Sequence, residues 1–315
     1  MTSVNIIPDS SPSQGLGHVS RCMSLAKVLK ERGFEINFTV SSYKALKHIH
    51  KKGYDASIGS NATDIYYDIT IVDSYTYPES YYIEQKKKQN CLIVIDDLAD
   101  RKLTSDIYIN HNLFANNLDL KNIISNHFLL GFEYALVDRS FYDITKIKKS
   151  SNCISISYGG TDNGQFSVPV IESLRKLKIE NPINLILSDL NKIKPEKLKY
   201  IRDNYIVNIS SEVEMSDILA DTFIFLCAAG QTSLEALISN TAFVAFLMAD
   251  NQIPNAKALK DLNFPVVNQF DPYIIAKKTK DIVNNNSPNQ FDFFYNKNVV
   301  IGPDNIVNRI VDYIK

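Results

Sequence analysis

The feature that most constrains the fold is an alternation of short apolar runs with segments of helical periodicity, which continues through both halves of the chain. Short, continuous apolar runs are typical of strands buried on both faces, and strands that alternate with helices predict an α/β architecture with parallel sheets. We expect strands at 4–7, 35–40, 68–72, 92–95 and 107–109, and again at 153–158, 183–187, 205–207, 223–227 and 242–246.

A polar, basic stretch at 146–152 interrupts this alternation, and the pattern restarts at Cys153. A chain of 315 residues is long enough for two domains of about 100–200 residues each. The sequence therefore predicts two Rossmann-like, doubly wound domains, at 1–148 and 149–315. The last expected helix, near 305–314, either stays in the second domain or packs back on the first.

Composition excludes several classes of partner. The 34 basic and 35 acidic residues are spread along the chain, so no basic stripe predicts binding to nucleic acid or to an anionic membrane surface. No apolar segment approaches the roughly 18 residues of a membrane-spanning helix, and the first residues lack a basic export signal. We therefore expect a cytoplasmic protein without membrane insertion. The four cysteines lie far apart, which predicts reduced thiols and no structural zinc.

The first candidate site is the segment Gly15-Leu16-Gly17-His18, between an expected strand and an expected helix. Glycines in such a turn let backbone N–H groups approach an anion, and the helix N-terminus favours negative charge. His18 at the start of that helix could move a proton beside a bound phosphate. The alternative is a structural or helix-capping histidine.

A matching element follows the expected strand at 223–227. Small residues, Ala229 and Gly230, precede a helix that we expect Thr232 and Ser233 to cap, with Glu235 in its first turn. Small residues at this point can also serve only close packing of helix on strand. Two such strand-turn-helix segments, one in each half of the chain, indicate a ligand held between two domains.

Other polar residues follow expected strands, where α/β sheets place ligand contacts. Asp73 and Tyr75 have a substrate role or a packing role. We interpret Asp96-Asp97 as turn-capping residues in preference to a metal-binding pair, and His111 as part of a polar turn, although it could also contact a sugar. Asn251 and Gln252 contact ribose or diphosphate, or simply begin a helix.

Several of these motifs together resemble a known family. They are Asp9-Ser10-Ser11, Gly15-Leu16-Gly17-His18-Val19 with Arg21-Cys22, Val72-Asp73-Ser74-Tyr75, Ile95 to Arg101, Asn110-His111-Asn112, Gly131 with Tyr134-Ala135-Leu136, Gly159-Gly160-Thr161-Asp162, Ala228 to Thr232 with Glu235-Ala236, and Ala249 to Gln252. In this order and spacing they resemble the UDP-sugar hydrolases of pseudaminic-acid synthesis and the related spore-coat polysaccharide proteins. The resemblance covers nearly the whole chain.

The resemblance implies a B-type glycosyltransferase-like fold with a central cleft, UDP in the second domain and the sugar facing the first. It implies hydrolysis of UDP-2,4-diacetamido-2,4,6-trideoxy-β-L-altropyranose with inversion, by water that His18 activates, without metal or cofactor. Gly15, Gly17, Asp73 and Tyr75 would then contact the substrate. The nucleotide side would comprise Gly159, Gly160, Thr161, Ala229, Gly230, Thr232, Glu235, Asn251 and Gln252.

Two positions depart from the family pattern, because Ile7 and Asp138 stand where the family commonly has arginine. The loss of these positive groups puts the identity of the sugar in doubt more than the type of reaction. The alternatives are a glycosyltransferase that uses the same cleft, a hydrolase of another nucleotide sugar, and a catalytically silent binding module. The sequence leaves the base, the sugar and the oligomeric state open.

Overall fold

The computed structural model describes residues 1–11, 16–59, 66–144, 151–159, 162–187, 193–211, 213–285 and 302–315. The chain divides into two compact units, Met1–Asp138 with Val299–Lys315, and Arg139–Asn298. The sequence analysis places the boundary after residue 148, whereas the units divide after Asp138 and the C-terminal segment belongs to the first unit.

The first unit has a seven-stranded sheet among its described residues, in the order β3-β2-β1-β4-β5-β6-β7, and every pairing is parallel. Its strands are β1 (Ser3–Pro8), β2 (Glu35–Val40), β3 (Asp55–Ile58), β4 (Ile69–Asp73), β5 (Cys91–Ile95), β6 (Leu103–Asn110) and β7 (Ile123–Leu130). Its helices are α1 (Gly17–Glu31), α2 (Tyr43–Lys51), α3 (Glu79–Lys88) and α12 (Pro303–Ile314), with short 3₁₀ turns at Ala115–Asn117 and Phe132–Tyr134.

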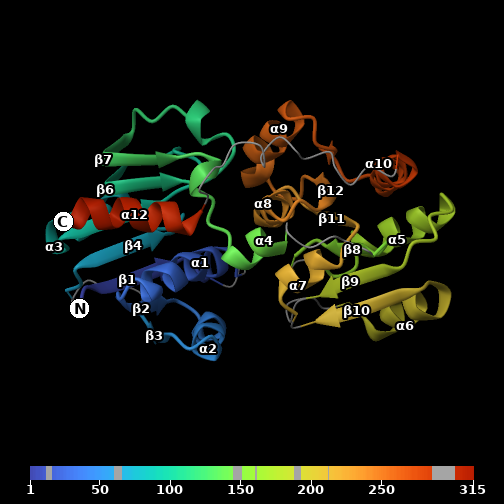
Figure 1. Ribbon diagram of the computed structural model, residues 1–315, viewed down its shortest axis with the longest axis horizontal. Helices are drawn as coiled ribbons and strands as arrows, with labels where there is room; N and C mark the ends of the chain where they lie inside the picture. The colour runs from blue at the N-terminus through green and yellow to red at the C-terminus, as the bar shows by residue number, and fades with distance from the viewer. Residues whose placement is uncertain are drawn as a thin grey trace. The chain divides into compact units, whose positions relative to one another are not determined.

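Two apolar clusters cover the opposite faces of this sheet. Adjacent residues of a strand point to opposite faces, so Ile6 packs with α1, α2 and α12, while Ile7 packs with Tyr81 and Tyr82 of α3. The last helix therefore completes the first core: Ile306, Val307 and Ile310 are buried in the cluster that includes Leu25 of α1. Figure 1 shows α12 alongside α1.

The second unit has a six-stranded parallel sheet among its described residues, in the order β10-β9-β8-β11-β12-β13. Its strands are β8 (Ile154–Ser157), β9 (Ile183–Leu187), β10 (Val207–Ser211), β11 (Ile224–Ala228), β12 (Ala242–Phe246) and β13 (Val266–Val267). Its helices are α4 (Arg139–Asp143), α5 (Ser167–Lys176), α6 (Pro195–Asn204), α7 (Met215–Ala220), α8 (Gln231–Ile238), α9 (Ile253–Asp261) and α10 (Pro272–Asn285), with a 3₁₀ turn at Asp250–Gln252. The predicted pair of doubly wound parallel α/β units is confirmed (Figure 1).

Three strands were not expected from the sequence, and one was displaced. β3 and β7 are edge strands with several exposed residues, and β13 is only two residues long, so none of them shows a continuous apolar run. The strand expected at 205–207 lies instead at Val207–Ser211. The order of the strands reverses between β1 and β4 in one sheet and between β8 and β11 in the other. Open α/β sheets bind ligands outside the carboxyl ends of strands at such a reversal.

Candidate functional site

The carboxyl ends of β1 and β4 hold the first group of predicted site residues. His18 is the second residue of α1, as expected, and Asp73 is the last residue of β4. The backbone N–H of Asp9, which follows β1, donates to the carbonyl oxygen of Asp73 across 2.6 Å. His18 and Asp73 therefore meet where the strand order reverses. Gly17 begins α1, and Gly15 lies outside the described residues.

His18 is bonded to Asp73 through one ring nitrogen. Its Nδ1 lies 2.7 Å from Oδ1 of Asp73, and both side chains are buried. An ionised carboxylate can only accept, so Nδ1 carries the proton and Nε2 keeps a lone pair. Within the described part of the chain, Nε2 has no hydrogen-bond partner. The ring of Tyr75 lies edge-on to the imidazole, with 4.8 Å between centroids.

Arg21, one turn further along α1, connects two carboxylates at neighbouring strand ends. Its Nε donates to Oδ2 of Asp73 across 2.7 Å, and its Nη2 donates to Oδ1 across 2.5 Å. Its Nη1 donates to both oxygens of Asp97, at 3.0 and 2.9 Å, and lies 3.2 Å from Nε2 of His111. Asn112 and the hydroxyl of Tyr75 also donate to Asp97.

This network is buried, and its charges shift its members' pKa values. Burial opposes ionisation of Asp73, but Arg21 and His18 outweigh it and hold the pKa of Asp73 well below its usual range. Burial also opposes ionisation of Asp97, yet Arg21 and then His111 lower its pKa to about 2. Burial, followed by the charge of Arg21, lowers the pKa of His111 to about 4. At neutral pH Arg21 is therefore a cation, Asp73 and Asp97 are carboxylates, and His111 is neutral.

The hydrogen bonds of Asp73, Asp96 and Asp97 show which protein groups these residues bind. Both oxygens of Asp73, predicted to contact substrate, accept hydrogen bonds from protein groups. Asp96 does cap its turn, because it accepts from the N–H of Ala99 at 2.7 Å, but Asp97 belongs to the Arg21 network, contrary to the capping interpretation. Tyr75 keeps an exposed part.

Arg21 and His111 are the members whose roles the sequence analysis missed. Arg21 lies among the mainly apolar buried residues of α1, and a buried charge there signals a buried partner. His111 is 1% exposed and lies against Arg21 and the N–H of Leu136, which is 3.4 Å from its Nδ1. It is therefore a buried member of the Arg21 network within the polar segment that follows β6.

The structure shows what surrounds Ile7 and Asp138, the two positions that depart from the pattern of the resembled family. Ile7 is buried in the apolar cluster that contains Val72 and Tyr82. Asp138 forms an ion pair with Lys27 of α1, with 3.2 Å between Nζ of Lys27 and Oδ2 of Asp138. Neither position supplies a positive group to the carboxyl edge of the sheet.

In the second unit, predicted residues follow β8 and β11, the strands at the reversal. Gly159 follows β8 with a φ of +77°, a conformation that favours glycine. Asp162 accepts from the N–H groups of Gly164 and Phe166 at 2.9 and 3.1 Å and so closes the turn before α5. Gly160 and Thr161 lie outside the described residues.

Ala229 and Gly230 form the turn between β11 and α8. The N–H of Ala229 donates to Phe246 at the end of β12, and Gly230 occupies the N-cap position of α8. A Cβ atom added at Gly230 would lie 3.2 Å from Nε2 of Gln252. The Oε1 atom of Gln252 accepts from the N–H of Met248 at 3.1 Å, so Gln252 joins this turn to the end of β12. Asn251, its neighbour, is exposed.

The prediction that Thr232 and Ser233 cap α8 is wrong. No side chain caps the helix, and both residues lie inside its first turn, where Oγ of Ser233 donates to the carbonyl oxygen of Gly230 across 2.6 Å. Asn255, which the sequence analysis did not single out, supports the turn by donating to the carbonyl oxygen of Ala229 at 2.9 Å.

Glu235 is the fifth residue of α8 and not in its first turn, contrary to the prediction. Burial raises the pKa of its carboxyl group to about 8, so the group is largely protonated at neutral pH. A neutral carboxylic acid can donate one hydrogen bond as well as accept others.

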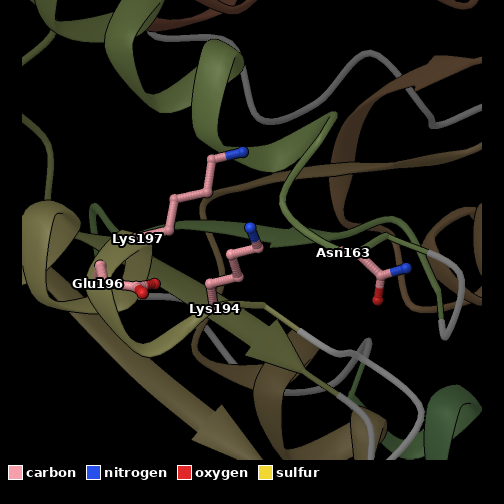
Figure 2. Close-up of a pocket in the computed structure, with 4 residues that line it drawn as sticks. All are labelled: Asn163, Lys194, Glu196 and Lys197. Atoms are coloured by element: carbon pink, nitrogen blue, oxygen red, sulfur yellow. The ribbon is translucent and has the colours of Figure 1, made fainter.

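A further hollow lies at the start of α6. It has a volume of about 570 Å³ and is lined by Asn163, Lys194, Glu196 and Lys197 (Figure 2). The Nζ atom of Lys197 donates to the carbonyl oxygen of Gly164 across 3.0 Å. The sequence analysis did not anticipate this hollow.

The described residues lack two kinds of feature. No group of three or more His, Cys, Asp and Glu side chains there has an arrangement that could hold a metal ion. Likewise, none of the helices in this part of the chain is long and apolar enough to cross a membrane.

No protein-family model matches the chain. An uncharacterised protein of Methanocaldococcus jannaschii, MJ1062, is 25% identical over 262 residues, which cover 74% of this chain and 53% of that protein. A Helicobacter pylori protein named pseudaminic acid cytidylyltransferase and UDP-2,4-diacetamido-2,4,6-trideoxy-β-L-altropyranose hydrolase is 24% identical over 276 residues, 82% of this chain and 47% of that protein. The chain thus spans about half the length of these curated relatives.

Solved structures resemble the chain over nearly its whole length. The spinosyn rhamnosyltransferase SpnG bound to thymidine diphosphate has a TM-score of 0.68 at 9% identity, covering 98% of this chain and all of that chain. Phytolacca americana UGT2 has a TM-score of 0.67 at 10% identity, covering 99% of each chain. Acinetobacter baumannii MurG has a TM-score of 0.59 at 12% identity, covering 91% and 92%. These likenesses establish the fold as that of the two-domain, B-type glycosyltransferases.

Proposed function

We propose that this protein hydrolyses a UDP-linked diacetamido-trideoxyhexose to UDP and the free sugar, with inversion at the anomeric carbon, as a step in surface-glycan precursor synthesis. The observation that carries the proposal is the bond between Nδ1 of His18 and Asp73, which leaves the Nε2 lone pair available at the carboxyl edge of the first sheet. The name of the H. pylori relative includes this hydrolase activity.

In the proposed reaction, Nε2 of His18 accepts a proton from water as that water attacks the anomeric carbon. Asp73 keeps the imidazole in the required tautomer and stabilises the imidazolium that forms. A positioned base of this kind contributes about 10²–10⁴-fold to the rate. Attack opposite the departing diphosphate inverts the anomeric configuration.

The second unit would bind the UDP group. The N-cap residue of α8 is Gly230, which has no side chain, and a helix N-terminus favours the negative charge that builds up on a leaving diphosphate. Gly159, Gly230 and Gln252 would surround the nucleotide, and the protonated Glu235 would bond to ribose hydroxyls. Asn251 and Thr232, which are not fully buried, complete the proposed set.

A glycosyltransferase reaction is the second candidate, because the structures with the same fold include a rhamnosyltransferase. The two reactions differ in what attacks the anomeric carbon. A hydrolase releases free sugar without an acceptor, whereas a transferase needs an acceptor hydroxyl.

The test is a reaction in H₂¹⁸O with a panel of UDP-diacetamido-trideoxyhexoses and no acceptor, followed by mass spectrometry and NMR. We expect equal amounts of UDP and free sugar, ¹⁸O in the sugar and not in UDP, and the inverted anomer as the first product. Incorporation of ¹⁸O into UDP would mean attack at phosphorus, and sugar transfer only with an added acceptor would favour the transferase.

A further inference from the structure

We infer that Arg21 is a positioning residue that sets the orientation and the working pH range of the His18 base through Asp73. The inference deepens the proposed function and rests on it, because it concerns the same base. No part of it requires Arg21 to touch substrate.

Arg21 fixes the orientation of Asp73 by bonding both of its carboxylate oxygens. Arg21 donates to both carboxylate oxygens, so the carboxylate plane cannot rotate without breaking a charge-assisted bond. Oδ1 of Asp73 is thus shared between Nη2 of Arg21 and Nδ1 of His18, and these two nitrogens are 3.2 Å apart. The orientation of the imidazole therefore depends on Arg21 through one shared oxygen.

Arg21 is itself held by a second carboxylate. Its Nη1 donates to both oxygens of Asp97, and the amide of Asn112 donates to Oδ1 of Asp97 across 2.7 Å. Arg21 is only 7% exposed, so solvent screens these interactions weakly. The guanidinium is consequently a fixed positive charge beside the base.

The charges around His18 act in opposite directions. The Asp73 carboxylate stabilises a protonated imidazole, whereas the Arg21 guanidinium opposes it, and Asp97 reduces the effect of Arg21 from farther away. The other groups packed here are neutral at neutral pH: His111, whose pKa is about 4, and Tyr75 and Cys22, whose pKa values are raised, mainly by burial. The positive charge of Arg21 therefore opposes the effect of the carboxylate with which the base is paired.

This arrangement of charges predicts that removal of Arg21 and removal of Asp97 shift the pH dependence of the reaction in opposite directions. In Arg21→Met a positive charge that repels the imidazolium is gone, so the midpoint of the acid limb of kcat should move to higher pH than in the wild type. In Asp97→Asn the full charge of Arg21 acts on the base, so this midpoint should move to lower pH. A charge within about 4–6 Å commonly moves such a midpoint by 1–3 pH units, so we expect about one unit or more for Arg21→Met and less for the more distant Asp97.

The experiment is a pH titration of the His18 ring signals by NMR in the full chain, with His18→Gln used to assign them, and kcat against pH in the same variants. Lys27→Met is the matched control, since it removes a positive charge from the exposed side of the same helix. We expect the control to leave both the midpoint and the acid limb of kcat unchanged. Arg21→Lys should keep the midpoint near the wild-type value but lower kcat, because lysine cannot donate to both oxygens in the same plane.

An unmoved midpoint in folded Arg21→Met and Asp97→Asn would overturn the inference, even if both variants lost activity. If Arg21→Met does not fold, Asp97→Asn and Arg21→Lys decide the question alone. A wild-type protein that hydrolyses no UDP-sugar would instead contradict the proposed function. The NMR titration would still measure the effect of Arg21 and Asp97 on His18.

Discussion

The carboxyl edges of the two sheets are built from different groups. In the first unit, side chains dominate: Arg21, Asp73, Asp97 and His18 are buried and bonded to one another. In the second unit, the turn at Ala229 and Gly230 presents mainly backbone, supported by Gln252 and Asn255, and the carboxyl group of Glu235 in the following helix is largely protonated.

The difference indicates a division of work between two edges with the same topology. A fixed array of charges controls a proton on a neighbouring base, whereas backbone N–H groups at a helix start bind an anion without a charged side chain. Changes at the first edge should therefore alter turnover and its pH dependence. Changes at the second should alter nucleotide affinity.

The largest expected change in stability comes from breaking the buried charge network. Arg21→Met leaves two buried carboxylates without their cation, which should lower the free energy of unfolding by about 3–5 kcal/mol. Gln252→Ala in the second unit removes one hydrogen bond to Met248 and should cost about 0.5–1.5 kcal/mol. Urea denaturation at pH 7 measures the free energy of unfolding of both variants. Equal losses in the two variants would contradict the difference between the two sheet edges.

The two units should respond to pH in opposite directions. The pKa of His111 is lowered in the folded state to about 4, so the first unit should lose stability as the pH falls from 6.5 to 4, by roughly 1.4 kcal/mol per pKa unit. The low pKa of Asp97 removes more stability between pH 4 and 2. The pKa of Glu235 is raised to about 8, so the second unit should lose stability as the pH rises from 4.5 to 8.

Hydrogen exchange followed by mass spectrometry measures the stability of each unit separately. The method needs no tryptophan fluorescence, and this chain has no tryptophan. Glu235→Gln should remove the loss of protection in the second unit at high pH and leave the first unit unchanged. A second unit that gained protection from pH 5 to 8 would show that Glu235 is ionised in the folded protein.

A smaller effect is expected at Gly230. In Gly230→Ala the new methyl group would crowd Nε2 of Gln252, which lies 3.2 Å from the Cβ position, and would narrow the turn that we assign to the diphosphate. UDP affinity should fall by about 5-fold, which corresponds to roughly 1 kcal/mol. Isothermal titration calorimetry with UDP measures the affinity. Unchanged affinity in Gly230→Ala would remove this turn from the nucleotide site.

The smallest effect is expected at Asp138, one of the departures from the family pattern. Its ion pair with Lys27 is partly exposed, so Asp138→Ala should change the free energy of unfolding by no more than about 1 kcal/mol. Thermal unfolding measures this, with Lys27→Ala as the partner variant. A much larger loss would mean that Asp138 has a structural role beyond this pair.

The fold could be predicted largely from local patterns. β2, β9 and β12 occupy the ranges expected from their apolar runs. β7 could not be found in this way, because an edge strand does not need a continuous apolar run, and its pairing with β6 is a long-range contact.

The site could be predicted only in its local parts. The position of His18 at a helix start follows from the residues around it, and so does the turn at Gly230. The joining of Arg21 to Asp73 and Asp97 depends on which strands are neighbours, since the ends of β4 and β5 meet only in the assembled sheet. The protonation of Glu235 depends in the same way on burial, which the sequence does not reveal.

The most direct test of the account compares turnover with nucleotide binding in one variant, His18→Gln. We predict that kcat for sugar release falls by about 10²–10⁴-fold while UDP binds with wild-type affinity, because the base and the nucleotide turn lie on different sheets. A His18→Gln protein that retained wild-type turnover, or that lost UDP affinity as completely as turnover, would contradict the division of work between the two edges.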